Sequence, residues 1–413
     1  MPELFNVLPP QAAKDLFCGR LSPLPGEERI PTWDALGRIC RRDIFSPSNL
    51  PAFSRSTMDG YAVRARDTYG ASEGIPAYLT VAGEAPMGRA PEFALASGQA
   101  ALVHTGGMLP EGADAVVMVE QTQQAEAGTV EVLRPVAPGE NVIQVGDDVK
   151  EGALLAPAGR WLRPQDIGGL VAVGITSLPV APRPKVALIA TGDELVGPGE
   201  SLRLGQVRDI NTYTISGLVQ RAGGTPVSLG IVPDDREALR RTAQAGLDQA
   251  DMVVISAGSS VSTRDMTAEV IASLGEPGVL VHGIAIRPGK PTILAIAQGK
   301  PVVGLPGNPV SAMVVFELLV TPALHKLAGC VDPPGRSRVE AYLARNIASI
   351  AGREDHVAVR LEQRNGATWA VPVFGESNLI TTLMKADGTV VVPLDKLGLP
   401  EGEKVTVDLF GAG

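Results

Sequence analysis

Short apolar segments alternate with helical patterns between residues 183 and 328, and this alternation constrains the fold more than any other feature of the sequence. Three of the segments, "KVALIATG", "PVSLGIVPD" and "ADMVVISAG", have the length and composition of strands buried in a parallel sheet. Between the last two, "REALRRTAQAGLDQA" places Leu239, Ala243, Leu247 and Ala250 on one face of a helix. The pattern predicts a parallel sheet flanked by helices, with ligands bound beyond the carboxyl ends of the strands.

The sequence on either side of this region indicates β structure. From about 49 to 180, segments such as "AALVHTG", "DAVVMVEQ" and "TVEVLRPV" are separated by Gly and Pro turns. From about 331 onward, strand-like segments surround the hairpin signal Asn365-Gly366, which fits a small barrel or sandwich. Because 413 residues exceed one ordinary core, we expect two to four domains.

Composition excludes several classes of function. The formal net charge of −9 argues against binding to nucleic acid or to an anionic membrane, because both require a dense cationic surface. The best apolar run, "AMVVFELLVTPAL", carries Glu317 and is shorter than the roughly 18 residues of a membrane helix. The N-terminal sequence lacks the pattern of a signal peptide. Cys18, Cys40 and Cys330 lie far apart without metal-binding spacing, so we expect free thiols in a reducing cytoplasm.

The first candidate motif is "STMDGYAVRARDT", residues 56–68. Asp59 and Gly60 form a turn signal, and a plain hairpin corner is one interpretation. The other is a carboxylate held on a tight turn to reach a ligand or metal, with Arg64, Arg66 and Asp67 close behind.

Two further motifs follow predicted strands. "ATGDELVGPG" places Asp193 and Glu194 where an open α/β sheet binds its ligand, although an ordinary turn with solvated acids is the alternative. In "VISAGSSVSTRDMT", small residues would let backbone N–H groups approach an anion, and hydroxyl side chains can add donors. A merely tight loop is also possible. Asp265, which we expect at the start of the helix "DMTAEVIASL", makes sense beside an anion chiefly if a divalent cation bridges the two.

The last two motifs are "AIRPGKPTI" and "GLPGNPVSA". The first sets Arg287 and Lys290 on either side of a Pro-Gly turn, which is either a solvated basic turn or a phosphate-binding pair. In the second, Asn308 is expected as an N-cap and Pro309 as the first helical residue, with glycines leaving the helix start open to an anionic group. Together the motifs describe a site for a phosphorylated ligand with a divalent metal.

In this order and combination the motifs closely resemble those of the MoeA family, the molybdopterin molybdenumtransferases whose eukaryotic counterpart forms part of gephyrin. The matching stretches are "MDGYAVR", "TGDEL", "GSSVSTRD", "RPGKP" and "GLPGNPVSA", with "HTGGMLPEGADAVV" and "VGDDVKEGALL" also in register. The resemblance covers essentially the whole chain and implies a multi-domain α/β plus β fold. The implied parts are an N-terminal helical segment packing with the α/β domain (1–26), a segmented elongated domain (27–48 and 148–177), an inserted β-domain (49–147), a molybdopterin-binding-type three-layer α/β domain (178–330) and a C-terminal β-barrel (331–413).

The resemblance also implies an activity. A protein of this family is expected to hydrolyse adenylylated molybdopterin with the help of Mg²⁺, insert molybdate into the dithiolene and release AMP, completing the molybdenum cofactor. It implies a homodimer with its active site in a cleft between subunits, and a molybdopterin adenylyltransferase and acceptor molybdoenzymes as partners.

Residue roles are carried over by position. The implied catalytic residues are Asp59, Glu194, Asp265 and Lys290. The implied metal ligands are Glu194, Asp265 and Asp234 or Asp235. The implied ligand-binding residues are Thr105, Asp148, Ser259, Ser260, Ser262, Thr263, Arg287, Pro306, Gly307, Pro309 and Ser377, with Arg353 as a weaker match.

One stretch departs from the family pattern. Many members read "SGGVSVG" where this chain has Ala257, Ser259 and Ser262 in place of glycine, valine and glycine. If either glycine required a positive φ, the substitution would cost roughly 1–2 kcal/mol. Two other functions stay open: a scaffold or sensor that binds molybdopterin without turnover, and the adenylylating activity, against which the β-domain and barrel argue. The sequence does not separate molybdate from tungstate.

Overall fold

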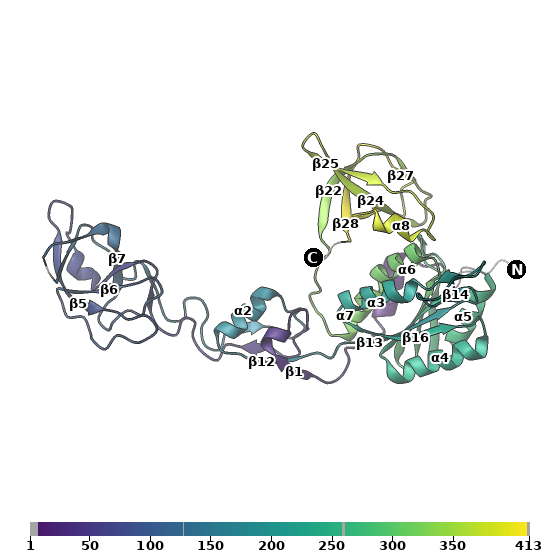
Figure 1. Ribbon diagram of the computed structural model, residues 1–413, viewed down its shortest axis with the longest axis horizontal. Helices are drawn as coiled ribbons and strands as arrows, with labels where there is room; N and C mark the ends of the chain where they lie inside the picture. Colours follow the sequence, from purple (N-terminus) through teal and green to yellow (C-terminus); the bar gives the residue numbers. More distant parts are fainter. Residues whose placement is uncertain (1–6, 127, 258–260, 411–413) are drawn as a thin grey trace.

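The computed structural model describes residues 7–126, 128–257 and 261–410, without the side chains of residues 261–264. These residues form an elongated molecule, with a β-domain at one end and an α/β domain at the other (Figure 1). A small unit joins the two, and a C-terminal barrel sits beside the α/β domain. The multi-domain α/β plus β architecture predicted from the sequence is therefore confirmed.

The α/β domain has three layers around a six-stranded sheet of order β16-β13-β17-β21-β20-β18. Its strands are β13 (Lys185–Thr191), β16 (Thr225–Val232), β17 (Met252–Ala257), β18 (Pro277–His282), β20 (Ile293–Ala297) and β21 (Lys300–Pro306). Its helices are α1 (Pro10–Cys18), α3 (Asn211–Arg221), α4 (Arg236–Gln249), α5 (Val261–Ser273), α6 (Pro309–Val315) and α7 (Thr321–Leu327). A π-helical turn (Phe316–Val320) joins α6 to α7, and two short strands, β14 (Leu195–Val196) and β15 (Val207–Arg208), pair outside the sheet.

Alternate residues of each strand face opposite helical layers, as the strand period of two requires. Val186 and Leu188 of β13 pack in a core with α1, α3, α6 and α7. Ala187 and Ile189 pack in a second core with α4 and α5. The predicted parallel sheet is correct for β16, β13, β17 and β21, but β20 runs antiparallel to both of its neighbours, β21 and β18, so the sheet is mixed.

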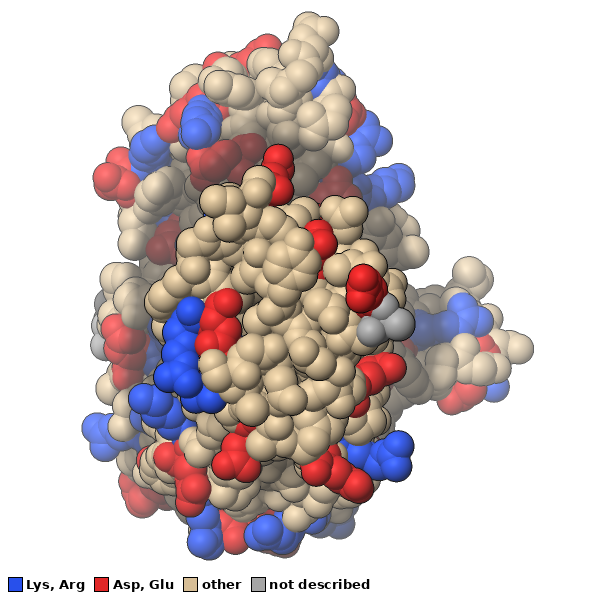
Figure 2. All heavy atoms as spheres, turned by 90° about the vertical axis from the view of Figure 1, so that its left-hand side faces the viewer, with Lys and Arg blue, Asp and Glu red and all other residues tan. Residues whose placement is uncertain are grey.

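The inserted β-domain contains a six-stranded sheet of order β7-β4-β6-β5-β9-β8. Its strands are β4 (Gly60–Val63), β5 (Ala77–Glu84), β6 (Gln99–Val103), β7 (Ala115–Met118), β8 (Thr122–Gln124) and β9 (Thr129–Val132), with a separate pair β3 (Arg55–Ser56) and β10 (Val142–Ile143). Short 3₁₀ turns cover Ala65–Thr68 and Val119–Gln121. At the outward end of this domain, acidic and basic side chains surround a largely uncharged face (Figure 2).

The connecting unit is built from two separate parts of the chain. Strand β1 (Glu28–Pro31) pairs with β12 (Ser177–Val180), and β2 (Ile44–Phe45) pairs with β11 (Leu154–Ala156). A 3₁₀ turn (Thr32–Asp34) and helix α2 (Pro164–Ala172) complete it. Its own small core includes Ala35, Leu162, Leu170 and Leu178.

The C-terminal unit is a closed barrel, which decides between the barrel and sandwich expected from the sequence. The strands β24 (Glu354–Arg364), β25 (Ala367–Pro372), β22 (Arg338–Leu343), β28 (Lys404–Leu409) and β26 (Gly388–Val392) pair in that order, and β26 pairs back to β24. The expected hairpin is present, with Asn365 (φ 49°) and Gly366 (φ 77°) joining β24 to β25. Outside the barrel wall, β23 (Ile347–Ala348) pairs with β27 (Gly398–Leu399), and α8 (Ile380–Met384) follows β25.

A short strand crosses from the α/β domain into the barrel. Strand β19 (Ile286–Arg287) pairs in parallel with β24, placing Arg287 opposite Asp355. The amide of Glu354 donates to the carbonyl of Ala285 at 2.8 Å. These hydrogen bonds fix the barrel against the α/β domain at one point of their junction.

The helical stretch Pro309–Leu327 passes a length and composition test for a membrane span within the described residues. Over half of its most apolar window is buried inside the protein, where Phe316, Leu319 and Leu324 belong to the α/β core. Its apolar character is thus accounted for by packing.

Candidate functional site

The carboxyl ends of three parallel strands lie side by side. Thr191 of β13 pairs with Ala257 of β17, and Ala257 pairs with Pro306 of β21. On the outer side, Val232 of β16 pairs with Thr191. The loops that carry four of the sequence motifs therefore leave the sheet at one edge, as expected for an open α/β sheet.

Acidic side chains gather after β13 and β16. The Thr191 hydroxyl donates to Oδ1 of Asp234 at 2.9 Å, and the amide of Asp234 donates to Oδ1 of Asp193 at 3.1 Å. Glu194 is exposed and folds back over Gly192, where a Cβ atom would come within 2.6 Å of Glu194 Oε2. Asp235 instead accepts the amide of Ala238 at 2.7 Å as the N-cap of α4, so its carboxylate already has a structural role.

The small-residue loop after β17 is only partly described. Ser259 and Ser260 lie outside the described residues, and Ser262 and Thr263 lie in the first turn of α5 without described side chains. Helix α5 begins at Val261, so Asp265 is inside the helix and does not cap it as expected.

The strain considered for this loop does not arise at the two substituted glycine positions. Ala257 is a buried residue of β17, and Ser262 is helical. Both positions have the negative φ that strands and helices share, so neither needs glycine.

The part of the chain that the structure describes contains no ready-made metal cluster. Across residues 7–126, 128–257 and 261–410, no group of three or more histidine, cysteine, aspartate or glutamate side chains is arranged to hold a metal ion. Glu194, Asp234, Asp235 and Asp265 follow strands of the same edge without forming such a group. Carboxylate and hydroxyl oxygens are nevertheless the donors that Mg²⁺ takes, and the acids around Thr191 supply them.

A cavity of about 790 Å³ opens between the α/β domain and the barrel. Several predicted site residues line it, namely Arg287, Lys290, Pro306, Gly307, Arg353 and Ser377. Pro309 is buried as the first residue of α6, next to the lining residues Asn308 and Val310. The two basic residues of the "RPGKP" motif therefore line the cavity wall, and both are exposed.

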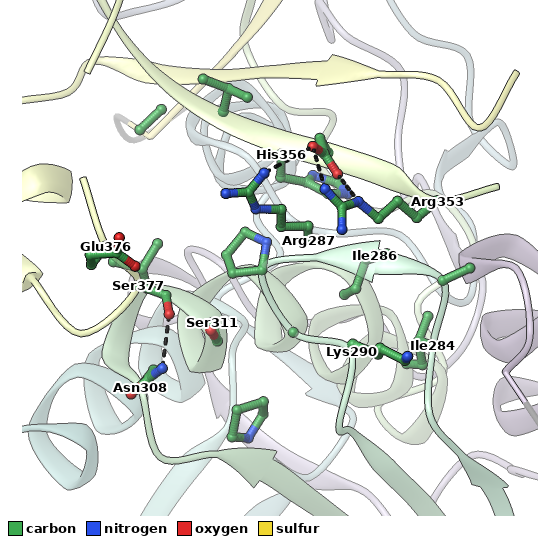
Figure 3. Close-up of a pocket in the computed structure, with 18 of the residues that line it drawn as sticks. Ile284, Ile286, Arg287, Lys290, Asn308, Ser311, Arg353, His356, Glu376 and Ser377 are labelled. Carbon is green, nitrogen blue, oxygen red and sulfur yellow. Dashed lines mark hydrogen bonds and ion pairs between the residues drawn. The ribbon is translucent and has the colours of Figure 1, made fainter. Parts of the chain in front are cut away.

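Two guanidinium groups converge on one carboxylate in this cavity (Figure 3). Arg353 donates through Nε to Oδ1 of Asp355 at 2.8 Å and through Nη2 to Oδ2 at 3.3 Å. Nη1 of Arg287 lies 3.7 Å from the same Oδ2. The Asp355 side chain is only 4% exposed, whereas that of Arg287 is 65% exposed.

On the opposite wall of the cavity, hydrogen bonds join the start of α6 to the barrel. Asn308 occupies the N-cap position as expected, but its side chain does not cap the helix. Its Nδ2 donates to Ser377 Oγ at 2.8 Å, and the Val310 amide donates to the Ser377 carbonyl at 3.1 Å (Figure 3). Gly289, between the two basic residues, has φ 119°, and a Cβ there would lie 2.5 Å from Val315 Cγ2. Only glycine fits this turn.

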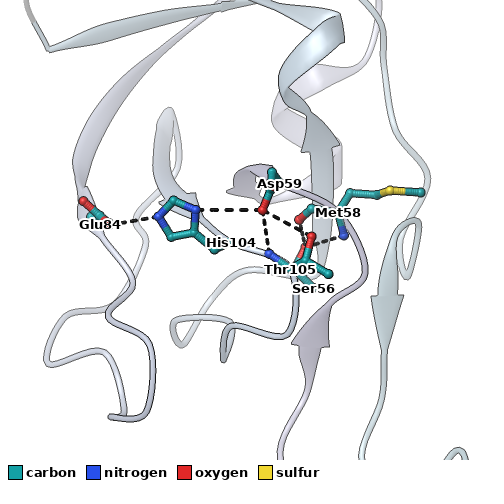
Figure 4. A network of polar contacts seen from close by, with 6 residues as sticks. All are labelled: Ser56, Met58, Asp59, Glu84, His104 and Thr105. Carbon is teal, nitrogen blue, oxygen red and sulfur yellow. Dashed lines mark hydrogen bonds and ion pairs between the residues drawn. The ribbon is translucent and has the colours of Figure 1, made fainter.

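Asp59 belongs to a separate polar cluster on the β-domain (Figure 4). Its Oδ1 accepts hydrogen bonds from the amide of Thr105 at 2.8 Å and from the Thr105 hydroxyl at 3.2 Å. These two bonds lower the pKa of Asp59, and His104 adds a smaller effect in the same direction. His104 Nδ1 lies 3.8 Å from Asp59 Oδ1, and its Nε2 lies 3.0 Å from Glu84 Oε1.

The Asp59 turn is not a hairpin corner. Strand β4, which starts at Gly60, pairs with β6 and β7 and not with β3. A Cβ at Gly60 would lie 2.0 Å from the Val117 carbonyl oxygen, so this glycine allows the close approach of β7. The turn thus presents an exposed carboxylate.

Predicted site residues lie at opposite ends of the molecule. Asp59 and Thr105 are on the β-domain, and Asp148 follows β10 at the base of this domain. The connecting unit separates them from the α/β domain that carries Glu194, Asp265 and Lys290 (Figure 1). One chain does not bring the two groups together.

Sequence reasoning missed several residues of these clusters. Asp355 and Ser311 line the cavity, and Glu84 and His104 extend the Asp59 cluster. Buried Asn211 donates to Ser256 Oγ at 2.7 Å and to the Gly307 carbonyl at 2.8 Å, joining the ends of β17 and β21. Only Asp355 had a usable signal, because it lies two residues after Arg353 in a strand-like segment.

Protein-family models match nearly the whole length of this chain. Three family models match: "MoeA N-terminal region (domain I and II)" over residues 8–174, "Probable molybdopterin binding domain" over 187–326 and "MoeA C-terminal region (domain IV)" over 340–410. A molybdopterin molybdenumtransferase of Haemophilus influenzae is 34% identical, over 94% of this chain and 95% of its own. One from Nostoc is 33% identical, over 98% and 91%.

Solved structures show the same similarity. A crystal structure of a molybdopterin biosynthesis MoeA protein from Pyrococcus horikoshii superposes with a TM-score of 0.82 at 40% identity, covering 99% of this chain and all of its own. A second from the same organism gives a TM-score of 0.86 at 32% identity, covering 98% of this chain and 100% of its own.

Proposed function

Because the chain belongs to the MoeA family of molybdopterin molybdenumtransferases, which act in molybdenum cofactor biosynthesis, we propose that it completes this cofactor by hydrolysing adenylylated molybdopterin and inserting molybdate into the dithiolene. AMP is the leaving product. The observation that carries the proposal is the cavity beside this edge of the α/β sheet, which Arg287, Lys290 and Arg353 line.

We assign the oxyanion substrate to this cavity. Molybdate is a tetrahedral dianion, and the cavity offers two guanidinium groups and an ammonium group, together with hydroxyls from Ser311 and Ser377. Charge-assisted hydrogen bonds of this type bind oxyanions strongly, and the guanidinium fork is directional. Tungstate has the same shape and charge, so the same residues would accept it.

We assign the pterin phosphate and its adenylate to the edge formed by β13, β17 and β21. Backbone amides at the start of α5 and α6 and the hydroxyls of the β17–α5 loop are the donors expected there. The Asn211 bonds to β17 and β21 hold this edge in one arrangement.

The acids of this edge fit a Mg²⁺ ion. Glu194 and Asp234 are the best ligands, because Asp235 is engaged as a helix cap, and Asp265 follows on α5. A bound Mg²⁺ would neutralise the phosphoanhydride charge and lower the pKa of a bound water. The chain's own contribution is to hold these carboxylates at the strand ends, where they would repel a phosphate in the absence of the cation.

The active unit is proposed to be a homodimer. Asp59 and Thr105 are exposed on the β-domain, far from the cavity of the same chain (Figure 1). A second copy that places its β-domain beside the α/β domain of the first would complete the site with an ionised Asp59, whose pKa the Thr105 hydrogen bonds lower further below its ordinary acidic value. Partners that supply the adenylate or accept the cofactor are part of the same proposal, as is a cytoplasmic location, with which the three free cysteines agree.

The test is a defined reaction with purified components. The protein is incubated with adenylylated molybdopterin, Mg²⁺ and molybdate, and AMP is followed together with activation of an apo-molybdoenzyme. Both signals are expected to require Mg²⁺ and molybdate and to be lost in Asp59→Ala. Tight binding without AMP would instead indicate a scaffold or sensor, and ATP-dependent formation of the adenylate would indicate the adenylylating activity.

A further inference from the structure

Asp355 places a buried negative charge in the wall of a cavity that we assign to an anion. The cavity lining carries the cations Arg287, Lys290 and Arg353 and the carboxylates Asp355 and Glu376. A buried carboxylate lowers the positive potential of an anion site and is costly to desolvate, so its place there needs a physical reason.

The reason lies in the geometry of its two partners, which come from different domains. Arg353 directly precedes β24 and Asp355 is the second residue of that strand, and both ends of the Arg353 fork reach the carboxylate. Arg287 comes from β19 of the α/β domain and is in register opposite Asp355. The carboxylate therefore holds two like-charged guanidinium groups near each other across the domain junction (Figure 3).

Each guanidinium keeps donors for a ligand after pairing. Arginine has five N–H donors, and Asp355 takes two from Arg353, while Arg287 Nη1 approaches at 3.7 Å. The Arg287 and Arg353 side chains are 65% and 31% exposed, so parts of both face open space in the cavity. The two hydrogen bonds to Asp355 orient the Arg353 fork, and the 3.7 Å ion pair keeps Arg287 beside it.

We propose that Asp355 is a positioning residue of the oxyanion site: it fixes Arg287 and Arg353 so that their remaining N–H groups bind one tetrahedral dianion. This inference rests on the proposed function. Asp355 does not touch the ligand, and its effect is transmitted through the two arginines.

Glu362 provides a matched control on the same strand. It also pairs with two arginines, Arg360 and Arg364, but near the hairpin and away from the cavity. Its side chain is 30% exposed, against 4% for Asp355. A change at Glu362 thus removes the same kind of contact without altering the anion site.

The experiment measures molybdate binding to the full-length protein by calorimetry at fixed ionic strength. Asp355→Asn is expected to weaken molybdate binding by about tenfold, the effect of losing a charge-assisted hydrogen bond, while Glu362→Gln binds as the wild type does. In turnover assays Asp355→Asn should raise KM for molybdate and leave KM for the adenylate unchanged. Unchanged molybdate affinity would overturn the proposal. Tighter binding would also overturn it, because Asp355 would then only subtract charge.

A double-mutant cycle tests the route of the effect. Arg353→Lys keeps the charge but loses the fork, so it should also weaken molybdate binding. Because Asp355 acts through Arg353 as well as Arg287, the loss in the double variant Arg353→Lys/Asp355→Asn should be smaller than the sum of the two single losses. Fully additive losses would show that Asp355 acts independently of Arg353 and would contradict the assignment.

A measurement on the wild type covers the case in which Asp355→Asn fails to fold. Exchange of the Arg353 Nε–H with solvent, followed by NMR without molybdate, should be at least about tenfold slower than that of Arg364, whose partner Glu362 is more exposed. Equal exchange rates would overturn the proposal.

The binding experiment also separates the two proposals. If the wild type binds no molybdate at all, the oxyanion assignment itself is wrong. If wild type and Asp355→Asn bind molybdate alike, only the role of Asp355 is wrong.

Discussion

The Oδ1 atom of Asp59 accepts two hydrogen bonds from the same residue, Thr105, one from its backbone amide at 2.8 Å and one from its hydroxyl at 3.2 Å. Both bonds favour the ionised carboxylate and lower its pKa. The turn after β3 and the loop after β6 are thereby fixed to each other, with the carboxylate on the exposed side.

Replacing the Thr105 hydroxyl isolates its contribution to the lowered pKa of Asp59. Thr105→Val keeps the amide donor and loses the hydroxyl, so the pKa of Asp59 should rise toward its ordinary value of 3.8 without reaching it. Titration of the Asp59 carboxyl by ¹³C NMR measures the change, with Thr105→Ser as the control that restores the donor. A Thr105→Val protein with the wild-type pKa would show that the hydroxyl bond does not act on Asp59.

Complementation between two inactive variants tests the shared site. Asp59→Ala and Lys290→Ala remove residues from opposite ends of the molecule (Figure 1). Alone, each variant should lose nearly all activity. Co-expressed at equal levels, random pairing should restore about a quarter of wild-type activity, because half of the dimers then contain one intact site of two. No recovery in verified hybrid dimers would show that both residues act within one chain.

Asp166 is predicted to make stability depend on pH. Burial raises its pKa, but hydrogen bonds from Arg163 and Arg160 outweigh burial and lower the pKa to about 2. Because the folded pKa is below the unfolded one, this stabilisation is complete above about pH 5 and disappears as the pH falls toward 2. At pH 7, Asp166→Asn should lose about 2 kcal/mol of unfolding free energy.

Urea unfolding of the connecting unit, followed by tryptophan fluorescence at pH 7 and pH 3, measures this loss. The difference between wild type and Asp166→Asn should shrink at the lower pH. Asp34→Asn, at an exposed position of the same unit, is the control and should match the wild type at both pH values. A difference that is the same at both pH values would exclude the carboxylate as its cause.

Glu317 is predicted to hold the barrel linker in place. It lies in the π-helical turn between α6 and α7, where it forms ion pairs with Arg221 of α3 and, at 2.8 Å, with Arg336 of the linker. Glu317→Gln should release Arg336 and speed trypsin cleavage after it by about tenfold, because a charge-assisted contact is lost. Glu362→Gln is the control. If trypsin cleaves Glu317→Gln after Arg336 at the wild-type rate, Glu317 does not hold the linker.

Local sequence signals predicted the elements well where neighbouring residues decide the structure. The apolar runs became β13, β16 and β17, and Asn365-Gly366 formed the expected hairpin turn. The motif loops meet at one sheet edge because parallel strands share a direction, which the strand and helix alternation already implied.

Other features depend on contacts between distant parts of the chain and were not predictable. The reversed direction of β20 follows from its short connection to β21, which apolar composition does not encode. Helix α5 begins four residues before Asp265, so the aspartate that looked like a helix cap lies inside the helix. The pairing of Arg287 with Asp355 arises only when the barrel docks on the α/β domain.

The most direct test of the central claim is the stoichiometry of one time course with purified protein, adenylylated molybdopterin and Mg²⁺, with and without molybdate. The account predicts one AMP released for each molybdenum cofactor formed, with both products absent when Lys290→Ala replaces the wild type. Binding of the adenylate without AMP release or cofactor formation in the wild type would contradict it.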